Sequence, residues 1–178
     1  TLARIALIPV FLLIAYWPPA VGVNGHDGGM TRHLVLTGIF VVAAVTDWFD
    51  GYLARTLNQT SAFGRFLDPV ADKLMVAAAL IVLVQWKPSI AMAFAAIVII
   101  SREITVSALR EWMAELGART NVAVSTVGKY KTAFQMIAIT VFLLNWQPLE
   151  TLAYGLLYTS VILTLWSMFI YLKAAWPY

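Results

Sequence analysis

The stretch that decides the fold is "TDWFDGYLARTLNQTSAFGRFLDPVADKL", residues 46–74, because it places four aspartates within a strongly apolar chain. Of the 178 residues, 61% are hydrophobic and 12% are charged, whereas about a quarter of the residues in a typical soluble domain are charged. This composition indicates an integral membrane protein. Carboxylates inside membrane-spanning segments are costly and are usually retained for a function. The four are Asp47, Asp50, Asp68 and Asp72.

Six segments are apolar and long enough to cross a membrane, for which roughly 20 residues are needed. Their predicted ranges are 2–17, 32–57, 63–86, 89–116, 127–145 and 149–173. The Gly-rich segment 20–30 is predicted to be a loop, and Gly117 to end the fourth helix. We therefore predict an all-α integral membrane protein with six transmembrane helices and a cytoplasm-facing polar cavity. Residues 1–178 are predicted to form a single domain.

Lysine and arginine are distributed unequally between the two sides that six spans define. Arg32 and Lys87 lie on one side, and the other ten basic residues lie on, or in the helix halves nearest, the opposite side. Because basic loops are retained in the cytoplasm, the side with ten is predicted to be cytoplasmic. All four aspartates lie toward it. The chain has no cysteine, so it has no disulfide and no thiolate metal site.

The spacing of the aspartates predicts a metal site. Asp47 and Asp50 are spaced i, i+3, and Asp68 and Asp72 are spaced i, i+4, so each pair shares a helix face. Since a short connection makes the two helices antiparallel neighbours, the two pairs are expected to meet at one depth. Oxygen ligands alone suit a hard cation such as Mg²⁺, and four carboxylates suffice for two ions.

Three uncertainties about this segment remain open at the level of sequence. The aspartates could instead form structural salt bridges with Arg55, Arg65 or Lys73. Pro69 either begins a helix that Asp68 caps, or lies inside a helix that starts near Ala62. The small residues either admit a phosphate-bearing ligand close to the backbone or serve close helix packing; these are Gly51, Ala54 and Gly64.

The complete spacing D-x2-D-G-x2-A-R-x8-G-x3-D-x3-D runs from Asp47 to Asp72, and every fixed position is met. In this pattern the chain resembles the CDP-alcohol phosphatidyltransferase family. Further segments resemble the bacterial branch of the family that uses sn-glycerol 3-phosphate as acceptor: "TLARIALIP" (1–9), "REITVSALREWMAELG" (102–117) and "VAVSTVGKYKT" (122–132). The resemblance therefore covers nearly the whole chain.

The resemblance implies a six-helix enzyme of the bacterial inner membrane, usually a homodimer, with its active site facing the cytoplasm. The implied reaction joins CDP-diacylglycerol and sn-glycerol 3-phosphate and requires Mg²⁺ or Mn²⁺. Asp72 is implied both as a metal ligand and as the general base. The four aspartates would hold two ions, and no nucleic acid is involved. The implied lining of the cytidine diphosphate pocket is Gly51, Ala54, Arg55 and Gly64.

The second substrate is a phosphomonoester, so a separate set of cations is expected to bind it. We expect Arg102, Arg110 and Lys129 to be its ligands, because Arg102 lies deep along the fourth helix and needs a partner. Alternatively, several of these basic residues serve only the membrane charge asymmetry. Arg4 is expected either to reach a substrate phosphate or to anchor the first helix at the lipid headgroups.

Three other functions remain open at this stage. Another member of the same family would use a different acceptor, such as inositol phosphate, serine or phosphatidylglycerol. A membrane prenyltransferase also holds Mg²⁺-diphosphate with paired aspartates, although the glycines and Ala54-Arg55 do not belong to that pattern. A cation transporter would use the aspartates as its ion site, but it would leave the basic residues without a role.

Overall fold

The computed structural model describes residues 2–17, 28–57, 62–117 and 126–176. Within these ranges, the side chains of residues 2, 3, 28, 47–57, 62–69 and 126–129 are not described. The described chain is helical and contains no β-strand. Its elements are α1 (Leu2–Tyr16), α2 (Gly28–Leu57), α3 (Ala62–Trp86), α4 (Ile90–Glu115), α5 (Thr126–Leu144), the 3₁₀ turn η2 (Gln147–Leu149) and α6 (Glu150–Ala175).

The six predicted helices are confirmed, with two refinements. The first concerns α2, which begins at Gly28, so the prediction of a loop was wrong for Gly28, Gly29 and Met30. Residues 20–27 of the predicted loop lie outside the described residues. The second concerns α3, which runs without a break from Ala62. Pro69 therefore lies inside the helix, and the alternative in which Asp68 caps it is wrong.

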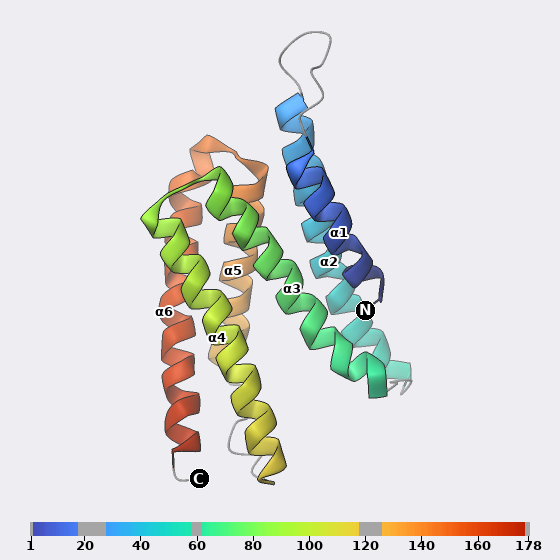
Figure 1. The fold of residues 1–178 in the computed structure, drawn as a ribbon, viewed down its shortest axis with the longest axis vertical. Helices are drawn as coiled ribbons and strands as arrows, with labels where there is room; N and C mark the ends of the chain where they lie inside the picture. The colour runs from blue at the N-terminus through green and yellow to red at the C-terminus, as the bar shows by residue number, and fades with distance from the viewer. Residues whose placement is uncertain (1, 18–27, 58–61, 118–125, 177–178) are drawn as a thin grey trace. The chain divides into compact units, whose positions relative to one another are not determined.

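The chain divides into two compact units. Unit 1 contains residues Thr1–Trp86 and Phe142–Trp146, and unit 2 contains Lys87–Val141 and Gln147–Tyr178. In unit 1, α1 packs against both α2 and α3, and α2 packs against α3 (Figure 1). This unit buries Phe11, Leu36 and Phe40 almost completely. Since lipid is as apolar as these side chains, close van der Waals packing is what stabilises such a core in a membrane.

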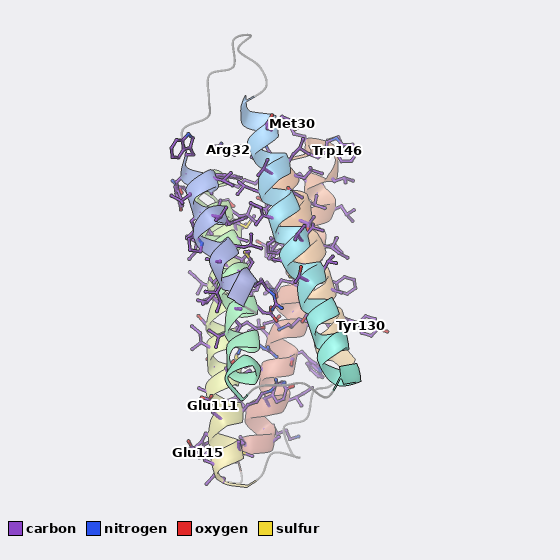
Figure 2. The ribbon with its side chains drawn as sticks, turned by 90° about the vertical axis from the view of Figure 1, so that its right-hand side faces the viewer. Met30, Arg32, Glu111, Glu115, Tyr130 and Trp146 are labelled. Carbon is purple, nitrogen blue, oxygen red and sulfur yellow. The ribbon has the colours of Figure 1, made fainter. Side chains whose placement is uncertain are left out.

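The first turns of α2 are tied to other elements of unit 1 by polar and aromatic contacts. His33 Nδ1 lies 3.0 Å from the carbonyl oxygen of Leu143, at the end of α5. Its ring packs edge-on against Trp86 at the end of α3, with 4.8 Å between the ring centroids. Arg32, labelled near the start of α2 in Figure 2, lies 5.0 Å from the centre of the same Trp86 ring. These contacts fix one end of unit 1.

Unit 2 is built around the pairing of α4 with α6, which lie side by side in Figure 1. Val106, Met113, Tyr171 and Ala175 form a buried cluster between these two helices. A stripe of buried polar residues follows α6: Ser160, Thr164 and Ser167. Their spacing of four and three residues places them on one face of the helix, so α6 presents a polar face to the interior of unit 2.

The apolar helices are those of a membrane protein. Within the described residues, three segments are long and apolar enough to cross a bilayer, and two shorter apolar helices cover Arg4–Tyr16 and Tyr130–Leu144. Large apolar side chains such as Ile97, Ile162 and Phe169 are exposed on the helix surfaces, as expected for lipid-facing positions. The total of six membrane spans remains a prediction. The three long segments are Gly29–Thr46, Ile90–Glu115 and Gln147–Ala175.

Both ends of α4 have a recognisable chemical signal. The hydroxyl of Ser89 accepts a hydrogen bond from the backbone nitrogen of Met92 at 3.1 Å, which caps the first turn. Gly117 follows the last turn with φ +74°, and its backbone nitrogen donates to the carbonyl of Ala114 at 3.2 Å. The prediction that Gly117 ends this helix is therefore confirmed.

The left-handed backbone at Gly117 provides a test of the fold. Neither Gly117 nor Gly155, which lies within α6, has any atom within 4 Å of an added Cβ. Gly117→Ala is expected to lower the free energy of unfolding by about 1 kcal/mol, because an L-residue is strained at positive φ. Gly155→Ala is the matched control and is expected to be neutral or slightly stabilising. Thermal unfolding in detergent measures both, and equal effects would contradict the assigned backbone at Gly117.

Candidate active site

The backbone places the acidic motif on two helices that pack against each other. Asp47 and Asp50 lie in the C-terminal half of α2, and Asp68 and Asp72 lie in the first half of α3. The side chains of Asp47, Asp50 and Asp68 lie outside the described residues, as do those of Ala54 and Arg55 and the surroundings of Gly51 and Gly64. Within the part that is described, no three histidine or acidic side chains gather as a metal site. The convergence of the four carboxylates remains a prediction.

Asp72 is the one motif carboxylate whose surroundings are described, and it pairs with an arginine of α1. Its Oδ1 accepts a hydrogen bond from Arg4 Nη1. The side chain of Arg4 is 2% exposed and that of Asp72 is 41% exposed. Arg4 thus connects the interior of unit 1 to a carboxylate that solvent or a ligand reaches. A contact with a substrate phosphate or with lipid headgroups was predicted for Arg4, and the ion pair with Asp72 was not.

Arg102 lies in the interior of unit 2, among residues of α4 and α6. Its Nη1 donates to Glu103 Oε1 at 3.1 Å and its Nη2 donates to Ser167 Oγ at 2.9 Å. Its guanidinium carbon lies 5.8 Å from the centre of the Tyr171 ring. The expectation that so deep an arginine needs partners is confirmed, and Glu103 is one of them despite being the next residue in the helix.

Arg110 shares the aromatic partner of Arg102. Its guanidinium carbon lies 5.0 Å from the centre of the Tyr171 ring, and its Nη2 donates to the Tyr171 hydroxyl at 2.6 Å. The two arginines are eight residues apart on α4, which is a little over two turns. One phenol therefore holds two of the three cations expected to bind the acceptor. Arg110 itself is exposed, so its charge remains accessible.

The lysine that the structure adds to this group is Lys131 of α5. Its Nζ donates to Glu103 Oε1 at 2.5 Å, and the side chain is 4% exposed. The side chain of Lys129, the lysine predicted from the sequence, lies outside the described residues, so its role stays a prediction. Burial of a lysine is unusual without a partner, and Glu103 supplies one.

We refer to these six residues of α4, α5 and α6 as the basic cluster: Arg102, Glu103, Arg110, Lys131, Ser167 and Tyr171. Ser167 and Tyr171 were not predicted from the sequence. Their i, i+4 spacing extends the polar stripe of α6 and could have indicated that both side chains lie on the interior face of this helix. Among these six residues are three cations, two of which contact the single carboxylate, so the cluster carries excess positive charge. Such an arrangement is suited to binding an anion.

The remaining acidic residues of α4 lie elsewhere. Glu111 and Glu115 are exposed near the C-terminal end of the helix (Figure 2). Tyr130, next to Lys131 on α5, is 65% exposed and points away from the helix axis (Figure 2). Neither Glu111 nor Glu115 therefore belongs to the basic cluster.

Comparison with known proteins identifies relatives over almost the entire chain. The family model for CDP-alcohol phosphatidyltransferase matches residues 1–166. A protein of Pectobacterium atrosepticum named CDP-diacylglycerol–glycerol-3-phosphate 3-phosphatidyltransferase is 50% identical, over 98% of this chain and 91% of that protein. Proteins with the same name from Yersinia pestis and Haemophilus influenzae are 49% and 48% identical, over 99% and 98% of this chain and 92% and 90% of their own lengths.

The Arg4–Asp72 ion pair predicts an energetic coupling between α1 and α3. In a double-mutant cycle of Arg4→Gln and Asp72→Asn, we expect a coupling energy of about 1 kcal/mol, smaller than for a fully buried pair because Asp72 is partly exposed. Unfolding in detergent, followed for the wild type, both single variants and the double variant, gives this value. Arg4→Gln combined with Glu150→Gln is the control and should be additive. Additivity in the first cycle would show that the pair does not stabilise unit 1.

Proposed function

The chain belongs to the CDP-alcohol phosphatidyltransferase family, and from this membership we propose that it transfers a phosphatidyl group from CDP-diacylglycerol to sn-glycerol 3-phosphate. The products are phosphatidylglycerophosphate and CMP. The observation that carries the proposal is identity of about one half, across nearly the full chain, to relatives whose names state this reaction. The complete acidic motif from Asp47 to Asp72 supports it.

The proposed cofactor is Mg²⁺, with Mn²⁺ as a substitute, and two ions are proposed. The fit rests on the chemistry of the donor set: four carboxylates offer only oxygen ligands, which hard divalent cations prefer. Asp72, the one of these four carboxylates whose side chain is described, is partly exposed and is therefore accessible to an ion. When bound, such ions neutralise the diphosphate and the departing CMP. The proposed ligands are Asp47, Asp50, Asp68 and Asp72.

Asp72 is also the proposed general base. Its carboxylate accepts the proton of the free 1-hydroxyl of glycerol 3-phosphate. The oxygen of that hydroxyl then forms a bond to the phosphorus that bears the lipid, and the bond from this phosphorus to the oxygen of CMP breaks. We propose a single in-line displacement. Arg4 contributes by holding the Asp72 carboxylate in one orientation, since its side chain is buried and hydrogen-bonded to Asp72 Oδ1.

The remaining motif positions are proposed to bind the nucleotide end of the lipid substrate. Gly51, Ala54 and Gly64 lack bulk, so a diphosphate is able to approach the helix backbone there. Arg55 offers a guanidinium, which binds phosphate oxygens in a bidentate manner. These assignments come from the family pattern rather than from described side-chain contacts.

The basic cluster is the proposed binding site for the phosphate of the acceptor. Arg102 and Arg110 are its proposed ligands, together with Lys129 from the sequence analysis and Lys131 from the structure. Support comes from the excess of positive charge, from the short hydrogen bonds that orient both arginines, and from the general use of arginine for phosphate recognition. All four residues lie in unit 2.

The proposal extends to the location and assembly of the enzyme. The chain is proposed to lie in the bacterial inner membrane, as a homodimer, with the acidic motif facing the cytoplasm and the lipids of the bilayer around its helices. The distribution of lysine and arginine supports this orientation, and the apolar helices support a membrane location.

The alternative functions are less well supported. The names of the relatives argue against inositol phosphate, serine or phosphatidylglycerol as the acceptor. Membership of the family argues against a prenyltransferase and against a cation transporter.

A direct assay tests the proposal. Purified protein supplied with CDP-diacylglycerol, labelled glycerol 3-phosphate and Mg²⁺ is expected to form a labelled lipid and CMP in equal amounts. Chelation of the metal should abolish the reaction, and addition of Mn²⁺ should restore it. Inositol phosphate and serine serve as competing acceptors. Incorporation of either in preference to glycerol phosphate would assign a different branch of the family, and no labelled lipid at all would refute the proposal.

Replacement of the motif carboxylates tests their role as ligands. Asp47→Ala and Asp68→Ala are each expected to lower turnover by at least a hundredfold and to weaken Mn²⁺ binding, which paramagnetic resonance measures without turnover, because each removes a charged ligand. Glu115→Gln also removes one carboxylate, but at an exposed position on α4, and should change neither quantity. Normal Mn²⁺ binding in both aspartate variants would exclude them as ligands.

A further inference from the structure

Glu103 lies inside the basic cluster and bonds two of its cations through a single oxygen. Its Oε1 accepts from Lys131 Nζ at 2.5 Å and from Arg102 Nη1 at 3.1 Å. The two cations are almost fully buried, with 4% and 8% of their side chains exposed, whereas the Glu103 side chain is 24% exposed. A carboxylate oxygen therefore occupies the point where a buried lysine and a buried arginine converge.

Arg102 retains a donor that this carboxylate does not satisfy. Its Nε is buried and has no hydrogen-bond partner among the residues whose side chains are described. Leaving a buried donor unsatisfied costs free energy, and charged groups cost the most. An incoming anion that engages the guanidinium would remove part of that cost. The cluster is thus arranged to accept oxygen atoms in addition to those of Glu103.

The charges of the cluster match a phosphomonoester when Glu103 is counted. Arg102, Arg110 and Lys131 contribute three positive charges and Glu103 one negative charge, which leaves an excess of two. A phosphomonoester carries close to two negative charges at neutral pH. Without Glu103, the cluster would exceed the charge of this ligand and would attract phosphate groups in general more strongly.

We propose that Glu103 is a counter-ion that limits the affinity of the basic cluster for phosphate, and thereby permits the acceptor to exchange. The inference rests on the proposed function, because glycerol 3-phosphate keeps its phosphate when it becomes product. Groups that hold this phosphate in the substrate also hold it in the product. Binding that is equally tight in both states does not accelerate the reaction, and it delays release. Glu103 lowers this affinity through its contacts with Lys131 and Arg102.

Phosphate binding to the purified full chain tests this role without turnover. The protein is placed in micelles of a neutral detergent, free of anionic lipid, and the Kd for inorganic phosphate is measured by calorimetry. Glu103→Gln keeps an oxygen that accepts hydrogen bonds from Lys131 and removes only the charge. We expect the Kd to fall about tenfold, as for removal of a like charge from a close, desolvated ionic site. Arg110→Gln should raise the Kd by a similar factor.

A matched control comes from another acid–lysine pair of the same unit. Glu150 accepts a hydrogen bond from Lys87 Nζ at 2.8 Å, outside the cluster, and Glu150→Gln should leave the Kd for phosphate unchanged. An unchanged or higher Kd for Glu103→Gln would overturn the proposal, as would the absence of phosphate binding by the wild type. Should Glu103→Gln fail to fold, Glu103→Asp replaces it. The shorter side chain withdraws the carboxylate from Lys131, so tighter binding supports the proposal and equal or weaker binding refutes it.

Turnover separates this inference from the proposed function. In Glu103→Gln, the KM for glycerol 3-phosphate and the kcat are both expected to fall severalfold, because the retained phosphate delays product release. A residue that only supports the fold would instead raise the KM or lower the kcat alone. If the wild type forms no labelled lipid while the phosphate affinities change as expected, the proposed function fails and the role of Glu103 in anion binding stands. If lipid forms but the affinities do not change, only the counter-ion role fails.

Discussion

Pairing of ionised side chains inside apolar helices is the constraint on which the rest of this structure depends. A charge in a membrane-spanning helix is costly unless another group neutralises or hydrogen-bonds it, and removing one member of a buried pair is strongly destabilising. Arg4 of α1 meets Asp72 of α3, and Lys131 of α5 meets Glu103 of α4. Each pair joins an ionised side chain of one helix to a partner on another, whereas apolar contacts alone discriminate weakly between partners, because lipid offers equivalent ones.

The two units have different charge chemistry. Unit 1 carries the acidic motif. Asp72, the motif carboxylate whose side chain is described, forms an ion pair with the guanidinium of Arg4. Unit 2 carries cations in excess, oriented by a tyrosine, a serine and a glutamate. A reaction between a diphosphate lipid and a phosphomonoester needs both chemistries: hard oxygen ligands for metal-bound diphosphate, and fixed guanidinium groups for phosphate.

Helices and their ends were largely predictable from the sequence, because length, apolarity and terminal residues are local properties. Gly117 ended α4 as expected, since glycine accepts the left-handed backbone at low cost. The start of α2 was not predicted, because Gly28 and Gly29 are typical of loops. Within the basic cluster, the depth of Arg102 and its need for partners were visible in the sequence. The contribution of Lys131 depended on the rotation of α5, which the sequence does not define, and the role of Lys129 stays a prediction.

Long-range pairs were the least predictable part of the candidate site. Arg4 and Asp72 are 68 residues apart, and no periodicity connects them. Aspartate partners were sought among nearby arginines and lysines, whereas the described partner comes from the first helix. Ser167 and Tyr171 were overlooked because each is unremarkable alone, although their spacing on α6 marks a polar face. The convergence of the four aspartates remains a prediction, supported by the packing of α2 against α3.

The burial of Arg4 also bears on how the chain is assembled during synthesis. Helix α1 leaves the ribosome before α3, so its arginine is synthesised while the aspartate that neutralises it has not yet been made. During that interval a long guanidinium side chain extends toward the lipid headgroups to remain hydrated. The ion pair that joins α1 to α3 therefore forms only after α3 has been synthesised.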